Sequence, residues 1–156
     1  MAEPSGFDPM TITESNATSY PEPYRDQNRK RWNRHLGEHT KLTNFGVNLT
    51  RIARGGQSSH RHAHTRQDEF IYVLEGEVVL ETDCGTEVLS AGMCAGFPAG
   101  SSNAHRFLNR SHADVVLLVV GDRTAGDEIT YPDIDMRARM QPSGGYRFFH
   151  KDGTAF

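Results

Sequence analysis

The sequence has few of the features that define disulfide-rich, secreted or membrane-spanning proteins. It contains two cysteines, Cys84 and Cys94, which are too few for a disulfide framework. We expect both to be small, partly buried thiols in a reducing compartment. The longest apolar run, residues 115–120, is far shorter than the roughly 20 residues of a membrane-spanning helix. Residues 1–20 have no apolar segment of the secretory type, so we expect a cytoplasmic protein.

An excess of charge of one sign is also lacking. The chain has 17 Lys and Arg against 20 Asp and Glu, a formal net charge of −3. This balance gives no basic surface for nucleic acid, and the short run Arg29-Lys30-Arg31 is typical of a solvated face. We therefore expect neither a nucleic-acid nor a membrane partner.

The length of 156 residues fits one domain with a self-sufficient core. Residues 1–25 are rich in Pro, Ser, Thr, Glu and Asn and show little periodicity, so we expect a mobile or loosely docked N-terminal arm. Residues 26–156 then form the single domain, because no linker or repeat divides them.

From residue 47 onward the chain consists of short β-rich runs separated by Gly, Pro and other turn residues. This spacing is typical of an all-β sandwich or barrel. Beyond residue 121 we expect a strand at 128–131, a short helix at 134–140 and an aromatic edge segment at 145–150. The strands expected before that point cover residues 47–53, 69–74, 77–81, 87–89, 105–109 and 115–120.

Three histidines and one glutamate form a candidate ligand set for a divalent transition metal. His62 and His64 are two residues apart, so on a strand both side chains lie on one face. Glu69 follows after a short polar link, and His105 lies on a later segment. Imidazole suits zinc, copper, iron and nickel, and carboxylate extends the range to manganese.

The flanking residues give this cluster a recognisable pattern. Residues 56–76 read G-x5-H-x-H-x4-E-x6-G, which resembles the first motif of the cupin family residue for residue. Residues 92–109 resemble the second motif, although four residues rather than two separate Gly100 from His105. The core motifs cover residues 56–109. The resemblance implies a double-stranded β-helix jelly roll and one metal ion held by His62, His64, Glu69 and His105.

Strand alternation predicts the wall around such a metal. If Glu69 and His105 point inward, Ile71, Val73, Phe107 and Asn109 share their face. An apolar pocket with a few polar groups is typical of a small-molecule site. Asn109 is more typical of a hydrogen bond beside a turn. His60 lies one alternation before His62, which makes it the candidate proton-transfer residue.

These residues leave two hypotheses about function. The first is a metal-dependent enzyme with dioxygenase, isomerase or lyase chemistry on a small polar metabolite, since four protein ligands leave about two positions open on an octahedral ion. The second is a module that binds a metal or small ligand without turnover, because cupins of similar ligand set serve both purposes. The substrate and the metal, whether Mn, Fe, Zn or Ni, stay open.

The same alternation predicts an apolar outer face. Phe70, Tyr72 and Leu74 point outward if their neighbours point inward. A contiguous apolar surface of this kind is rarely left exposed. We expect a homodimer, or a cover formed by Trp32 or by Phe148 and Phe149.

Overall fold

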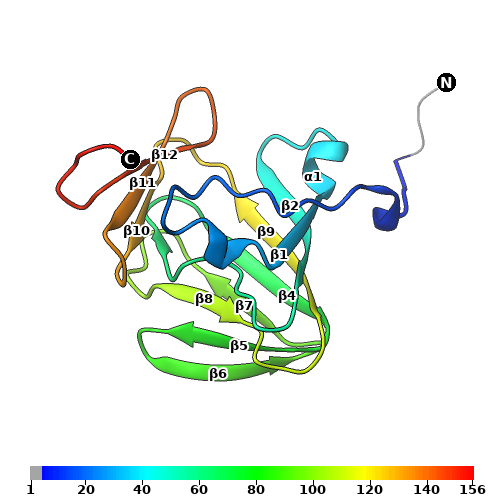
Figure 1. Cartoon of the computed structure of the whole chain (residues 1–156). Helices are drawn as coiled ribbons and strands as arrows, with labels where there is room; N and C mark the ends of the chain where they lie inside the picture. Colours follow the sequence, from blue (N-terminus) through cyan, green and yellow to red (C-terminus); the bar gives the residue numbers. More distant parts are fainter. Residues whose placement is uncertain (1–4) are drawn as a thin grey trace.

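The computed structural model describes residues 5–156 and consists mainly of antiparallel β-strands. Figure 1 shows them stacked as a barrel. The all-β jelly-roll prediction is therefore confirmed. The helical pieces are short: η1 (Pro9–Thr11), η2 (Asp26–Asn28) and α1 (Leu36–His39). The strands are β1 (Arg31–His35), β2 (Phe45–Ile52), β3 (Ala63–His64), β4 (Glu69–Glu75), β5 (Glu77–Thr82), β6 (Gly85–Ser90), β7 (Cys94–Phe97), β8 (His105–Leu108), β9 (Val115–Asp122), β10 (Glu128–Tyr131), β11 (Met136–Met140) and β12 (Tyr146–Phe149).

The largest sheet has the strand order β1-β2-β9-β4-β7. Its inner face follows the alternation of β4, where Ile71 and Val73 are buried while Phe70, Tyr72 and Leu74 are exposed. The expected inward and outward faces of this strand are thus confirmed. Its inner residues pack in one cluster with those of the three-stranded sheet β6-β5-β8. The main core therefore lies between these two sheets.

The remaining sheet, β12-β11-β10-β3, carries a second core cluster. Met136 and Ala138 of β11 are fully buried here, and β11 pairs with both β10 and β12. The prediction of a helix at 134–140 is therefore wrong, because pairing on both sides decides the conformation of this segment. The strand at 128–131 and the edge segment at 145–150 are confirmed, since β12 ends the sheet.

Two motif glycines stand where a side chain does not fit. Gly76 joins β4 to β5 with φ of +80°, a conformation that favours glycine. A Cβ at this position would lie 2.9 Å from the carbonyl oxygen of Asp114. At Gly56 a Cβ would lie 2.8 Å from the Cβ of Lys30. Close packing of the backbone thus explains why these two motif positions are glycine.

The N-terminal segment lies against the edge of the large sheet. Ser15 pairs with Asn33 of β1, Glu14 forms an ion pair with Arg51, and Tyr20 is buried in the second core cluster. The mobility of the arm stays a prediction, and its first four residues lie outside the described residues. In residues 5–156 no helix is long and apolar enough to cross a membrane.

The two cysteines differ from expectation. Cys84 and Cys94 are both free, as expected, but both are exposed rather than partly buried. Cys84 lies in the turn between β5 and β6, and Cys94 begins β7 on the outer side of the large sheet, opposite Tyr72. Neither position faces a core cluster.

Candidate metal centre

Backbone pairing places the histidines of the two motifs side by side. The amide of His62 donates to the carbonyl of His105 at 3.0 Å, and the amide of His105 donates to the carbonyl of His62 at 2.8 Å. Glu69 begins β4, whose first residue pairs with Phe97 of β7. The four residues between Gly100 and His105 therefore do not displace His105 from this group.

The three imidazoles converge on one carboxylate oxygen. The Nε2 atoms of His105, His62 and His64 lie 3.0, 3.3 and 3.6 Å from Glu69 Oε2. This oxygen is buried, and none of these contacts has the geometry of a hydrogen bond. Ligand atoms of His62, Glu69 and His105 lie within 4.8 Å of one another, whereas His64 is outside this group, although its Nε2 lies near the same oxygen. A buried carboxylate oxygen surrounded by imidazole nitrogens fits a divalent cation.

In His62 and His64 the Nδ1 atom of the imidazole ring contacts another protein group, so the Nε2 atom is the one that faces the candidate metal centre. His62 Nδ1 lies 2.9 Å from the carbonyl oxygen of His60, and His64 Nδ1 lies 2.6 Å from Asp127 Oδ2. His105 is held by stacking, with its ring parallel to that of Phe97 at a centroid distance of 3.5 Å. Contacts of this kind fix ligand orientation in metal sites.

Asp127 is a positioning residue that sequence reasoning missed. It is 1% exposed and accepts hydrogen bonds from the Arg66 amide at 2.8 Å and the Tyr146 hydroxyl at 2.9 Å. It is 63 residues from His64, and only the pairing of β3 with β10 brings the two together. The local sequence around Asp127 resembles an ordinary turn.

The charges of the group suit metal binding at neutral pH. Burial alone would raise the pKa of Glu69, but the neighbouring imidazoles, His62 foremost, hold that pKa well below its usual range. Burial lowers the pKa of His105, so its ring is neutral. Burial also acts to lower the pKa of His62, yet the Glu69 carboxylate outweighs burial and raises it. A metal ion would compete with that proton.

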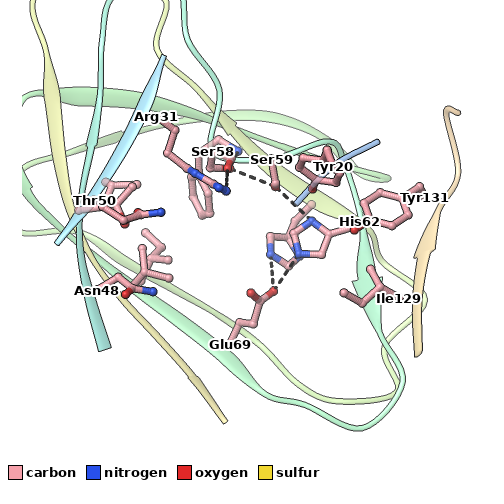
Figure 2. Close-up of a pocket in the computed structure, with 16 residues that line it drawn as sticks. Tyr20, Arg31, Asn48, Thr50, Ser58, Ser59, His62, Glu69, Ile129 and Tyr131 are labelled. Atoms are coloured by element: carbon pink, nitrogen blue, oxygen red, sulfur yellow. Dashed lines mark hydrogen bonds and ion pairs between the residues drawn. The ribbon is translucent and has the colours of Figure 1, made fainter. Parts of the chain in front are cut away.

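The centre opens onto a cavity of about 240 Å³. Figure 2 shows Glu69 and His62 on one side of this cavity and Arg31, Asn48 and Thr50 on the other. The apolar part of the lining comprises Ile71, Phe107, Leu117, Val119 and Ile129. This mixture of apolar walls and few polar groups is that of a small-molecule site.

Only some of the residues predicted to line the cavity do so. Ile71 and Phe107 line the cavity as expected, whereas Val73 is fully buried in the core behind it. Asn109 holds the backbone instead, because its Nδ2 donates to the carbonyls of Ile52 and Ala113, each at 2.8 Å. Asn109 therefore forms hydrogen bonds beside a turn, as its position in the sequence indicated.

His60 does not share the ligand face. Its Nε2 lies 3.0 Å from the carbonyl oxygen of Tyr24, and its ring packs edge-on against Tyr20 and Tyr24. It lines a neighbouring pocket beside Arg61. Strand alternation does not extend to His60 because β3 begins only at Ala63. Its role in proton transfer stays a prediction without a contact to the centre.

Arg31 is the second residue that sequence reasoning missed. Its place in a basic run predicted a solvated side chain, but it lines the cavity and its Nη1 donates to the carbonyl of Ser58 at 2.6 Å. Arg31 and Asn33 alternate along β1, and both face the cavity. Recognition of residues 31–35 as a strand would have revealed this face.

Fold, motifs and ligand geometry agree on one family. Residues 48–121 match the family model of the cupin domain. The chain belongs to the cupin superfamily. Among curated proteins, none matches this chain.

Solved structures resemble the chain over most of its length. A structure described as a sugar phosphate isomerase of the cupin superfamily from Silicibacter pomeroyi is 40% identical, with a TM-score of 0.92 over 97% of this chain and 96% of that one. A candidate sugar phosphate isomerase from Acidithiobacillus ferrooxidans is 28% identical, with a TM-score of 0.72 over 81% and 80%. The polyketide cyclase RemF from Streptomyces resistomycificus, at 21% identity and a TM-score of 0.63 over 77% and 80%, shares the fold.

Proposed function

We propose that this chain is a metal-dependent isomerase of a small sugar phosphate. The observation that carries the proposal is the convergence of three imidazole Nε2 atoms on the buried Oε2 of Glu69 at the wall of a cavity. The similarity to the Silicibacter pomeroyi structure supports the reaction class, because it extends over nearly the whole of both chains.

The residues fit one divalent ion held by His62, His64, Glu69 and His105. The ligand set is compatible with Mn, Fe, Zn or Ni. When bound, such an ion supplies Lewis-acid polarisation of a carbonyl group. The protein's part is to orient the imidazoles, which the contacts of His64 with Asp127 and of His105 with Phe97 achieve.

The remaining lining residues bind and orient the substrate. Burial raises the pKa of both Tyr20 and Tyr131, so their phenols stay protonated and offer hydrogen bonds rather than act as bases. Isomerisation moves a proton between neighbouring carbons and needs a side chain that can accept it. Among the described lining residues Glu69 carries the only carboxylate, and its Oε1 lies outside the set of converging atoms. We assign the proton transfer to this oxygen.

The test follows deuterium uptake from D2O by proton NMR. Purified protein is incubated with a panel of triose, tetrose, pentose and hexose phosphates, with and without prior chelation. We expect interconversion of one aldose–ketose pair, with deuterium entering at the carbon beside the carbonyl, loss of this activity after chelation, and recovery with added divalent metal. Metal-loaded protein that binds a panel member without exchange or turnover would instead support a binding module.

We further propose a homodimer formed through the outer face of the large sheet. Phe70, Tyr72 and Leu74 are 43%, 38% and 42% exposed and lie on one face of β4. Phe148 does not cover them, because it packs against the second core cluster. A second copy of the chain would bury this surface. We place the protein in the cytoplasm, where its exposed free thiols would stay reduced.

A further inference from the structure

Arg31 brings a positive charge into the cavity without a carboxylate partner. None of the carboxylates in residues 5–156 lies within ion-pair distance of its guanidinium. Its Nε is buried and has no hydrogen-bond partner, while Nη1 donates to the carbonyl of Ser58. An arginine stays charged when buried. Burial of an unpaired guanidinium costs free energy unless a ligand supplies the missing hydrogen-bond acceptors. The free edge of Arg31 is therefore a candidate anion site.

The residues around Arg31 add further hydrogen-bond donors. Asn33 follows on the same face of β1, and its Oδ1 accepts a hydrogen bond from the Thr50 hydroxyl at 2.7 Å. Asn48 on β2 has its Oδ1 2.9 Å from His35 Nδ1. Both carboxamide oxygens are thus engaged. Within the described part of the chain neither Nδ2 donates to a protein group, so both amides remain available to a ligand.

The donors and the metal ligands lie on opposite sides of one cavity. Figure 2 shows Arg31 and Asn48 on the side formed by β1 and β2, facing Glu69 and His62. The first side offers donors and positive charge, and the second offers a cation site. A ligand that spans the cavity would need an anionic group at one end and neutral or enolic oxygens at the other.

We propose that Arg31, Asn33 and Asn48 form the subsite that binds the phosphate group of the substrate. The inference rests on the proposed function and deepens it by fixing the orientation of the substrate, with phosphate at β1 and β2 and the carbonyl end at Glu69. A phosphate monoester presents three terminal oxygens, which match the free edge of Arg31 and two amides from different strands. A carboxylate presents only two. Arginine is suited to such bidentate contacts.

Titration with inorganic phosphate in chelator-treated protein tests the subsite apart from the metal. Isothermal calorimetry should detect phosphate binding by the wild-type chain. Arg31→Met should weaken it about 10- to 100-fold, the loss of hydrogen bonds to a charged group. Arg31→Lys should give an intermediate affinity because it keeps the charge and loses the bidentate geometry. The matched control is Arg34→Met on the same strand, since Arg34 contacts Ile12 and Glu14 outside the cavity.

A second variant keeps the test decisive if Arg31→Met fails to fold. Asn48→Asp preserves shape and places a negative charge beside the phosphate, so it should also weaken phosphate binding. Unchanged phosphate affinity in folded Arg31→Met or Asn48→Asp would overturn the subsite, as would failure of the wild-type chain to bind phosphate. Acetate bound as tightly as phosphate would overturn the choice of phosphate.

The outcome is separable from that of the proposed function. Phosphate binding that depends on Arg31, in a protein that isomerises no sugar phosphate, would uphold the subsite and refute the reaction. Isomerisation with the same KM in Arg31→Met as in the wild type would uphold the reaction and refute the subsite.

Discussion

Asp127 determines which nitrogen of His64 faces the candidate metal centre. Its carboxylate lies 2.6 Å from Nδ1 and therefore holds the proton there, leaving Nε2 to coordinate. We predict that Asp127→Asn lowers divalent-metal affinity by about 10- to 100-fold, the usual effect of losing such a partner. Competition with a fluorescent chelator measures this affinity.

Tyr146→Phe provides the control for this variant. It removes one hydrogen bond to Asp127 and keeps the carboxylate, so its effect on metal affinity should be smaller. Burial and the neighbouring Asp127 raise the pKa of Tyr146, so the phenol is a donor throughout the accessible pH range. Equal metal affinity in Asp127→Asn and the wild type would remove Asp127 from the centre.

Residue patterns predicted the convergence of His62, Glu69 and His105 and the lining residues Ile71 and Phe107, but not Asp127 or Arg31. Motif spacing predicted the ligands because His62, His64 and Glu69 lie in one short motif and His105 lies in the other, and a backbone bridge pairs His105 with His62. Asp127 depends on a pairing between β3 and β10 that no local signal encodes. Arg31 was assigned to a solvated face because its run of basic residues hid the alternation of a polar strand.

At the scale of elements, Glu14 links the N-terminal segment to the large sheet. Its carboxylate contacts Arg51 at 2.5 Å, and the hydrogen bond from Arg51 lowers the pKa of Glu14 below its usual value. Because the pKa of Glu14 is lowered in the folded state, the ion pair stabilises the protein fully above about pH 4.5. This stabilisation is lost as pH falls through the folded-state pKa of Glu14. The pair is partly exposed, so its contribution is a few tenths to about 1 kcal/mol.

We predict that Glu14→Gln lowers the free energy of unfolding by this amount at pH 7, and that the difference shrinks as pH falls through the lowered pKa of Glu14. Urea unfolding at several pH values measures the difference. Glu22→Gln, which removes a more exposed pair with Arg25, should change stability less at every pH. A Glu14→Gln difference that persists unchanged in acid would show that the ion pair is not its cause.

Most of the strands could be predicted because glycine and proline separate short β-rich runs. Among the strands that were missed, two have identifiable reasons. β1 has the polar sequence RWNRH, which lacks the apolar alternation of a half-buried strand because one face lines the cavity. β7, with the sequence CAGF, is short and contains glycine. The helix expected at 134–140 failed because strand pairing overrode local preference.

At the scale of the whole molecule, the exposed face of β4 predicts self-association. We expect Tyr72→Arg to shift sedimentation velocity from dimer to monomer, because a charge at the centre of an apolar interface is left desolvated and unpaired. Val88→Arg is the matched control: Val88 is 51% exposed but belongs to β6 in a different sheet. A wild-type chain that sediments as a monomer at all micromolar concentrations would contradict the dimer.

The architecture was more predictable from the sequence than the assembly or the chemistry. The two cupin motifs contain the glycines at close backbone contacts and the residues of the metal centre, and together these imply the jelly roll. Assembly depends on surface exposure, which becomes measurable only once the sheet is built. Substrate choice depends on which side chains meet across the cavity, and those come from β1, β2 and β4 rather than from the motifs alone.

The metal content of the purified protein tests the central claim most directly. Elemental analysis by inductively coupled plasma mass spectrometry should find close to one equivalent of a divalent transition metal per wild-type chain. The double variant His62→Ala, His64→Ala should lose it, while a double variant of the exposed histidines, His39→Ala, His112→Ala, should retain it. A folded His62→Ala, His64→Ala protein that keeps one equivalent would contradict the account.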